Sequence, residues 1–271
     1  LFALVALLGY AITPDGTPYC NQQYLELATL KPGSKATFLC IDPKEDAGGS
    51  FFAGHPLPYT AIPIEECHPV GDSLAVVPLA GEPFTIDRDR SMGTQERTFL
   101  LGTDAYGRDV LSMIMIGSRV SLSVGLIAVL IALLIGITLG ALAAYHGGWV
   151  DNLILWFINV VWSIPTVLLV IAITFALGKG FWQVFIAVGL TMWVDIARVV
   201  RGEVYSLKEK EFVTAGRALG YSSFRIIFRH ILPNIAGAVI VVTASNFATA
   251  ILLEAGLSFL GIGVQPPLPS S

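Results

Sequence analysis

Four long stretches without a charged side chain limit the folds open to this sequence more than any other feature. They run from Val120 to Ala144, from Asn152 to Gly178, from Gly180 to Val194 and from Ile231 to Leu253. A membrane-spanning helix needs roughly 20 mainly apolar residues. We therefore predict four full transmembrane helices. We expect the apolar residues 1–12 to be the end of a preceding transmembrane helix rather than a signal peptide.

The composition agrees with a chain that is largely embedded in lipid. Only 13% of the residues are charged and 54% are hydrophobic, with a mean hydropathy of +0.72, whereas a soluble domain carries about 25% charged residues. The expected fold is an all-α polytopic membrane bundle, with five transmembrane helices in this sequence and six in a full chain. Its parts are a partial first helix (1–12), an extracytoplasmic segment (13–111) and a transmembrane domain (112–271) with a cytoplasmic loop (201–233).

The distribution of basic residues indicates the orientation of the chain. Residues 198–233 contain seven basic and three acidic residues, whereas residues 13–111 contain seven basic and fourteen acidic residues. Short loops rich in Lys and Arg stay on the cytoplasmic side of a membrane. We therefore place 198–233 inside, and the order of the predicted spans then places 13–111 outside.

The outer segment is rich in Pro, Gly and Thr between residues 13 and 98. Short runs at 35–41 and 73–77 are typical of strands between turns. We expect a small, partly β insertion that lies on the membrane surface. It is either a docking surface for an external partner or a structural cover.

The cytoplasmic loop is expected to begin with a short amphipathic helix. Ser206 and Glu209 match a capping box that would start it, and Gly220 would end it in the left-handed conformation. Its apolar residues recur at helical spacing and are Phe212, Ala215 and Leu219.

A second short helix follows, with Ser222 as its N-cap. It has an apolar face and two arginines on its polar side, namely Phe224, Ile227, Phe228 and Ile231 against Arg225 and Arg229. Pro233 is expected to end this helix and to start the next span. The two helices fit either a groove of a partner protein or a lipid headgroup layer. A helix-turn-helix bound to DNA is disfavoured, because the loop is held between two spans.

Residues 211–233, EFVTAGRALGYSSFRIIFRHILP, resemble the EAA loop of ABC importer permeases. The family pattern is Glu-Ala-Ala, three residues, Gly, nine residues, Ile, one residue and Leu-Pro. Thr214, Ala215 and Gly216 stand at the first three places, and Gly220 holds the glycine. Thr214, Gly216 and His230 depart from the pattern. The resemblance implies that contact with an ATPase is made by Glu211, Thr214, Ala215, Gly216, Arg217, Leu219, Gly220 and Pro233.

Other segments resemble the permeases of dipeptide, oligopeptide and nickel importers. They are LGTDAYGRD (101–109), GWVD (148–151), SIP (163–165), RGEV (201–204), EAGLSFLG (254–261) and QPP (265–267). The resemblance covers residues 99–271. It implies a permease subunit in the inner membrane of a bacterium or archaeon, surrounded by membrane lipid. Its implied partners are a homologous second permease, two ATP-binding subunits and a solute-binding protein that delivers short peptides or nickel chelates.

The sequence carries no Walker-type phosphate loop. We therefore expect no ATPase site, no cofactor and no metal in this chain, and ATP bound by the partner subunits instead. The sequence also lacks the motifs of an intramembrane hydrolase. We expect no nucleic-acid partner. The alternative function is an ion- or proton-coupled secondary transporter, in which an acid such as Glu254 would titrate during transport.

Several residues within the predicted spans are expected to affect helix packing, helix bending or polar contacts in the membrane. Gly136 and Gly140 form a small-xxx-small pair suited to close helix packing, and Pro165 is expected to kink its span. Glu254 and Pro165 are candidates for the translocation path or a subunit interface. For Glu254, the alternative is a paired structural acid. Asp195 and Arg198, which are three residues apart, are expected to form a structural ion pair.

All three cysteines, Cys20, Cys40 and Cys67, fall in the outer segment. The outer side of a bacterial inner membrane is oxidising. One disulfide with any of three pairings, or three unpaired thiols, are equally compatible with the sequence.

Overall fold

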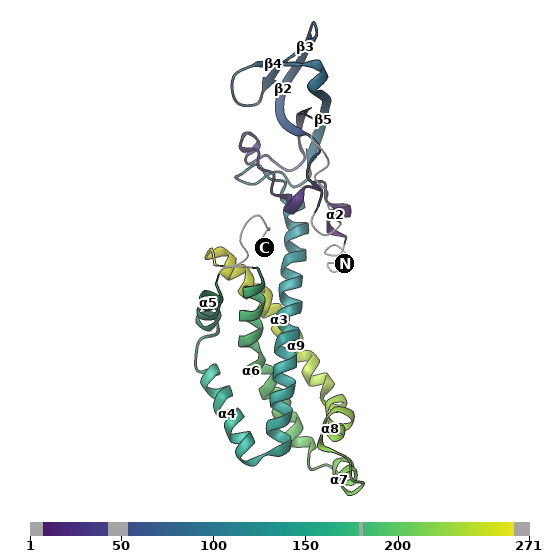
Figure 1. The fold of residues 1–271 in the computed structure, drawn as a ribbon, viewed down its shortest axis with the longest axis vertical. Coiled ribbons are helices and arrows are strands. Elements are labelled where there is room, and N and C mark those ends of the chain that lie inside the picture. Colours follow the sequence, from purple (N-terminus) through teal and green to yellow (C-terminus); the bar gives the residue numbers. More distant parts are fainter. Residues whose placement is uncertain (1–7, 43–53, 179–180, 263–271) are drawn as a thin grey trace. The chain divides into compact units, whose positions relative to one another are not determined.

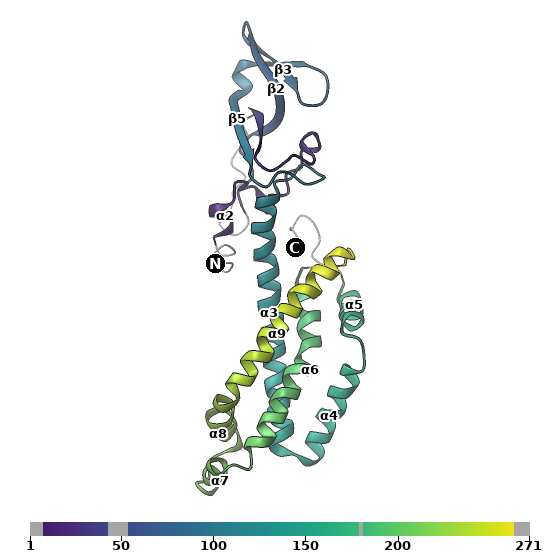
Figure 2. The same ribbon diagram turned by 180° about the vertical axis from the view of Figure 1, so that it is seen from behind.

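A computed structural model describes residues 8–42, 54–178 and 181–262. It divides into two compact units, which we call unit 1 (residues 1–120) and unit 2 (residues 121–265) and describe separately. Figures 1 and 2 show the elements from two opposite sides. Unit 1 is built around a β-sheet, and unit 2 consists of helices.

The sheet of unit 1 has five antiparallel strands in the order β4-β3-β2-β1-β5. The strands are β1 (Ser34–Ile41), β2 (Thr60–Val70), β3 (Ser73–Pro78), β4 (Phe84–Asp87) and β5 (Ser91–Phe99). β1 and β3 contain the two runs that the sequence marked as strands. Short helices, α2 (Gly9–Ile12), η1 (Pro18–Cys20), η2 (Leu25–Leu27) and η3 (Arg88–Arg90), accompany the sheet.

Side chains from both faces of the sheet are buried, because successive residues of a strand point to opposite sides. Phe38 lies in one cluster with Tyr24, Leu27 and Phe99. The other cluster belongs to the opposite face and consists of Leu39, Ile41, Ile64, Val76 and Ile86. The first face is the one that bears the polar features described below.

The three cysteines are free thiols, so the disulfide that the sequence allowed is not formed and the alternative of unpaired thiols holds. Cys20 and Cys40 are buried and Cys67 is half-buried. The Cys20 thiol donates a hydrogen bond to the Asp15 carbonyl oxygen at 3.0 Å. Burial and the nearby Asp15 carboxylate together raise the pKa of Cys20 to about 12. This sulfur therefore stays protonated at neutral pH.

Three helices of the described chain are long and apolar enough to cross a membrane. They are α3 (Val110–His146), most of α6 (Phe181–Leu207), and the continuous helix Ser223–Phe259, which contains α8 (Ser223–Ile226), η4 (Ile227–Ile231) and α9 (Leu232–Phe259). The remaining helices are α4 (Gly148–Trp162), α5 (Thr166–Leu177) and α7 (Glu211–Ala218). α6 packs against α4, α5 and α9 (Figure 2).

The stretch from 152 to 178, expected to be one kinked span, is instead two helices. α4 and α5 meet at an angle of 93°, so they are either one broken span or a re-entrant pair. Pro165 lies at the N-cap of α5, with a φ of −55°. Because proline has no N–H and disfavours a helical residue before it, the helix ends at Trp162 and a new one begins after Pro165.

Small residues let α3 and α6 approach closely, as predicted. A Cβ atom on Gly136 would lie 2.7 Å from the Ile196 Cβ, and one on Gly140 would lie 2.5 Å from the Ala197 carbonyl oxygen. Gly189 of α6 makes the reciprocal approach, with a Cβ position 3.0 Å from the Ala128 carbonyl oxygen. At these points the glycines have no room for a side chain, because the neighbouring helix lies directly against them.

Two buried polar side chains of α9 are hydrogen-bonded inside the helical unit. Glu254 is fully buried, and its carboxylate oxygens accept hydrogen bonds from the Ser121 hydroxyl (3.2 Å) and the Ser258 hydroxyl (2.8 Å). Asn246 donates from Nδ2 to the Met192 carbonyl oxygen of α6 at 3.2 Å. This geometry matches the interpretation of Glu254 as a paired structural acid.

The predicted pair of Asp195 and Arg198 is wrong, since no ion pair joins these two residues in the part of α6 described here. The Arg198 guanidinium instead lies 3.6 Å from the centre of the Trp162 ring of α4. One turn further, Arg201 binds both carboxylate oxygens of Asp151 at 2.6 and 2.7 Å. The arginines of α6 therefore join it to α4 instead of pairing along their own helix.

Candidate coupling surface

α7 does not start at the predicted capping box. α6 continues through Ser206 to Leu207, and α7 begins at Glu211 after a short turn, with Lys210 at its N-cap. The apolar Val204 is fully buried and Leu207 packs against the core, so burial favours one more turn of α6 over a cap at Ser206. Glu211 still stands in the first turn of α7, where a negative charge is favourable.

The C-terminal end of α7 is as predicted. Gly220 has a φ of +76°, and its N–H donates to the Arg217 carbonyl oxygen, while the Tyr221 N–H donates to the Gly216 carbonyl oxygen, both at 3.0 Å. These two bonds form a Schellman motif. A residue with a side chain would be strained at this φ, so glycine fixes the turn between the two helices.

The second helix is capped as predicted but does not end at Pro233. The Ser222 hydroxyl accepts a hydrogen bond from the Arg225 N–H at 3.4 Å. From Ile227 to Ile231 the backbone forms a π-helical turn, η4, and the helix passes without interruption into α9. Pro233 lies in the first turn of α9, where its missing N–H is tolerated because the π turn has already altered the bonding pattern.

Aromatic and apolar contacts fix α7 against the second helix. Val213 and Gly216 of α7 are buried, as is Ile226. The rings of Tyr221 and His230 stack with centroids 5.8 Å apart and planes 14° apart. His230, which departs from the EAA pattern, therefore contributes a stacking partner for the residue that follows the Gly220 turn.

Two cations connect this loop to the C-terminal end of α3. Lys208 donates from Nζ to the Ala144 carbonyl oxygen at 3.1 Å. The Arg217 guanidinium of α7 lies 5.3 Å from the centre of the Tyr145 ring. Positive charge is favourable at the C-terminal end of a helix, where carbonyl groups are unpaired. The helix pair is thus anchored to the helical unit at both the α6–α7 turn and α7 itself.

The outward side of the helix pair is apolar. Leu219 is 71% exposed and Phe224 69%, and Phe212 and Phe228 are exposed as well. The Phe224 and Phe228 rings lie 4.3 Å apart. We call these four residues the apolar patch. All four belong to the faces that the sequence predicted to be apolar, whereas Ile227 and Ile231 of the second face are buried, as is Ile226.

The predicted coupling residues come together on α7 and its C-terminal turn, except for Pro233 in α9. All are exposed apart from Gly216, namely Glu211, Thr214, Ala215, Arg217, Leu219, Gly220 and Pro233. Pro165 and Glu254 belong to other parts of unit 2 and lie outside this surface. Sequence reasoning missed Lys208 and Tyr145, whose roles depend on the end of α3. It also missed Val213, although its apolar side chain beside Phe212 was a usable signal.

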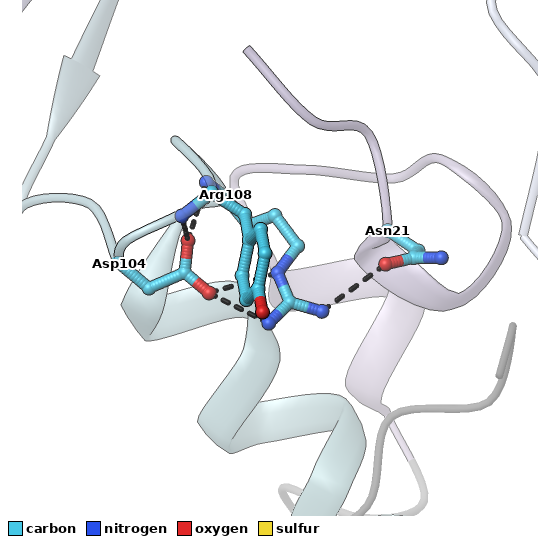
Figure 3. Close-up of polar contacts among 4 residues, drawn as sticks. Asn21, Asp104 and Arg108 are labelled. Atoms are coloured by element: carbon cyan, nitrogen blue, oxygen red, sulfur yellow. Dashed lines mark hydrogen bonds and ion pairs between the residues drawn. The ribbon is translucent and has the colours of Figure 1, made fainter. Parts of the chain in front are cut away.

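The motif at 101–109 belongs to unit 1 and forms a compact polar turn before α3. The Asp104 carboxylate accepts hydrogen bonds from the Arg108 Nε (2.8 Å) and from the N–H groups of Tyr106 and Arg108 (2.9 Å each). Arg108 also donates to Asn21 Oδ1 at 3.2 Å (Figure 3). Partial burial raises the pKa of Asp104, but the hydrogen bonds with Arg108 and Tyr106 outweigh it, and the net pKa is lowered.

Known proteins resemble a large part of this chain. The family model described as binding-protein-dependent transport system inner membrane component matches residues 136–271. The glutathione transport system permease protein GsiD of Pectobacterium atrosepticum is 38% identical over 183 residues, which cover 68% of this chain and 61% of that protein. The dipeptide transport system permease protein DppC of Alkalihalophilus pseudofirmus is 45% identical, covering 62% of this chain and 55% of that protein.

Two further comparisons extend this picture. The oligopeptide transport system permease protein OppC of Bacillus subtilis is 39% identical, covering 62% of this chain and 55% of that protein. The chain thus spans between half and two thirds of the length of these relatives. A chain of the MetNI methionine ABC transporter in an inward-facing conformation has a TM-score of 0.50 at 18% identity, covering 56% of this chain and 76% of that chain. At this identity the likeness shows a shared fold only.

Proposed function

Because this chain belongs to the family of binding-protein-dependent transport system inner membrane components, we propose that it is a permease subunit of an ATP-driven peptide importer. It would pass short peptides delivered by a solute-binding protein across the bacterial or archaeal inner membrane. The relatives named for dipeptide, oligopeptide and glutathione transport support the peptide class over nickel chelates. A homologous second permease and two ATP-binding subunits would complete the assembly.

The observation that carries this proposal is the apolar patch on an anchored helix pair. Exposed aromatic and leucine side chains on a rigid surface are suited to burial in a partner protein. The same residues stand in the segment that resembles the EAA loop. We propose that an ATP-binding subunit receives α7 and the Gly220 turn in a cleft, and that ATP-driven closure of the two ATP-binding subunits moves this helix.

The anchoring of α7 determines how such a movement would reach the spans. Moving a two-state equilibrium from 1:99 to 99:1 requires about 5.5 kcal/mol of differential interaction. A flexible loop would absorb this free energy. The Schellman turn at Gly220, the Tyr221–His230 stack and the contacts of Lys208 and Arg217 with α3 oppose such a loss.

The proposed topology has residues 198–233 on the cytoplasmic side and the sheet of unit 1 on the outer side. It includes one partial and four further spans in this sequence, with α4 and α5 counted as one broken span. A secondary transporter acting alone is not favoured, because the family is defined by dependence on a binding protein.

Co-purification with the ATP-binding subunits tests the proposal. Leu219→Asp and Phe224→Asp should each weaken the complex by about 30-fold and reduce ATP-dependent peptide uptake, because losing a buried apolar anchor costs about 2 kcal/mol. Leu25→Asp is the matched control, since Leu25 is 67% exposed but lies in unit 1. Uptake that continues without any ATP-binding subunit would refute the importer assignment.

A further inference from the structure

Unit 1 contains a cavity of about 310 Å³ beside its edge strand, β5. Across the β1–β5 ladder Ala36 faces Arg97 and Phe38 faces Gln95. Directly opposite residues project from the same face of a sheet, so Arg97 and Gln95 share the face of Phe38. The Arg97 guanidinium lies 4.8 Å from the centre of the Phe38 ring, and Tyr24 meets the same ring edge-on at 4.9 Å. Arg97, Gln95 and Tyr24 all line the cavity.

Two loop segments also line the cavity, one near Asp15 and Gln22 and the other just before α3. Asp109 belongs to the second segment and is the N-terminal cap of α3. Its Oδ2 atom accepts a hydrogen bond from the Ser112 N–H at 3.1 Å. Its Oδ1 atom is left for the cavity that the residue lines. The cap therefore holds the Asp109 carboxylate in one orientation.

Buried polar atoms without partners distinguish this cavity from an ordinary surface hollow. Gln22 Oε1, the Tyr24 hydroxyl and Asp109 Oδ1 are buried and have no hydrogen-bond partner among the described residues. Tyr24 is 9% exposed and Asp109 8%. Nearly all buried polar groups in native proteins are hydrogen-bonded. Three such atoms around one cavity indicate that a polar molecule completes it.

The residues that line the cavity carry charges of both signs. Arg97 on the strand side forms no ion pair within 4.0 Å in the described part of the chain. The neighbouring Glu96 is bound by Lys35 at 3.2 Å. The loop side supplies the carboxylates of Asp15 and Asp109. Arg97 therefore suits an anionic group of a ligand, and the two carboxylates suit a cationic hydrogen-bond donor.

The phenol of Tyr24 lies near the Arg97 guanidinium. Burial raises its pKa to about 12, although the nearby Arg97 guanidinium acts in the opposite direction. Tyr24 therefore stays protonated at neutral pH and can donate to a carboxylate. Metal ions are a poorer match, because the described residues include no group of three or more His, Cys, Asp or Glu side chains placed to hold one.

From these observations we infer that unit 1 binds a small zwitterion, a free α-amino acid or dipeptide, in this cavity. The ligand carboxylate faces Arg97 and the Tyr24 hydroxyl, and its ammonium group donates to Asp109 Oδ1 and Gln22 Oε1. Such a site lies within unit 1 and goes beyond the proposed import function. It does not depend on ATP-binding subunits, although its ligand class overlaps with the proposed substrates.

Calorimetry with the full chain, purified without ATP-binding subunits, tests the inference. The probe is L-alanyl-L-alanine, which should bind saturably at one site. Its N-acetylated and C-amidated forms should each bind about 10- to 100-fold more weakly, because each lacks one charged hydrogen-bonding end. No saturable binding of the dipeptide, or equal binding of all three probes, would overturn the inference. This arm requires no variant.

Matched variants locate the site. Asp109→Asn keeps an acceptor for the α3 cap but removes the charge, and Arg97→Gln removes the guanidinium. Each should lower dipeptide affinity about 10-fold or more, whereas Asp72→Asn and Arg88→Gln, at exposed positions of the same unit, should leave it unchanged. Unchanged affinity in the first two variants would refute the assignment. Uptake by the assembled transporter, measured in parallel, separates this outcome from a failure of the import proposal.

Discussion

The two units differ in the groups that they leave without a partner, which are apolar in unit 2 and polar in unit 1. Unit 2 satisfies buried polar groups such as Glu254 and Asn246 with internal hydrogen bonds, and exposes an apolar patch on its helix pair. Unit 1 buries apolar side chains on both faces of its sheet, and keeps unpartnered polar atoms around a cavity. An apolar surface is suited to a protein partner, and a polar cavity to a small molecule. Unit 2 is therefore suited to a protein partner and unit 1 to a small molecule.

The units also differ in how glycine permits close packing. Gly107 in unit 1 has a φ of +73°, and a Cβ atom there would lie 1.7 Å from the Tyr24 carbonyl oxygen. Gly140 in unit 2 is helical, and the clash would be with the neighbouring helix α6. The first glycine is needed for both backbone conformation and space, whereas the second is needed for space alone.

The largest expected effect is that of Gly107→Ala. We expect unit 1 to lose about 3 kcal/mol or more of stability, since the clash is with backbone and adds to the strain of the positive φ. Limited proteolysis should show rapid cleavage within residues 8–120 while the helical content of unit 2 persists. Gly71→Ala is the control, because Gly71 has a φ of +62° but open space around its Cβ position. Equal effects of both substitutions would contradict the packing role of Gly107.

A smaller loss is expected for Gly140→Ala in unit 2. The added methyl group must displace α3 from α6, which costs about 1–3 kcal/mol in a packed interior. Thermal unfolding in detergent measures the loss. Gly237→Ala in α9, where nothing lies within 4 Å of the Cβ position, should be neutral or stabilising. A destabilisation by Gly237→Ala as large as that by Gly140→Ala would show that space is not the deciding factor.

The pH dependence of unit 1 should depend on Asp104. Because its folded-state pKa is lowered, its contribution to stability is present above the ordinary aspartate pKa of about 4. That contribution is lost as the pH falls through this value toward the folded-state pKa. Between about pH 5 and pH 3, the stability of unit 1 should therefore fall more steeply in the unsubstituted protein than in the Asp104→Asn variant. Identical acid profiles would remove Asp104 from the explanation.

The smallest effect, and a stabilising one, is expected for Gly216→Ala in α7. A Cβ atom there would contact Tyr221 at 3.4 Å without a clash, and alanine is favoured over glycine within a helix by about 1 kcal/mol. The helix pair should become more stable by a fraction of that value and still bind the ATP-binding subunits. Hydrogen exchange of α7 amides measures the gain, and Gly220→Ala, which strains the Schellman turn, should act in the opposite direction.

Local signals predicted local features well. The Gly220 turn, the Ser222 cap and the close approach at Gly136 and Gly140 all depend on short sequence patterns that the structure confirms. The start of α7 was predicted wrongly because burial of Val204 extends α6 over a capping pattern that was locally sound.

Features that depend on distant partners could not be predicted in this way. Arg198 binds the face of Trp162 from another helix, and Arg201 binds Asp151, although both arginines had nearer acidic neighbours in sequence. The cavity of unit 1 combines residues separated by most of the unit, and no spacing pattern relates Arg97 to Asp109 or Tyr24. The matching family model covers residues 136–271, and the cavity lies outside that range.

The π-helical turn at Ile227–Ile231 has a mechanical consequence. It lets one helix run from Ser223 to Phe259, a rod of 37 residues that is about 55 Å long at 1.5 Å per residue. The helix stays continuous at the point where Pro233 would otherwise break it. A tilt of roughly 10° imposed at the Phe224 end would displace the opposite end by roughly 10 Å. Leverage of this kind lets a small rotation at one tip become a large displacement beside Glu254.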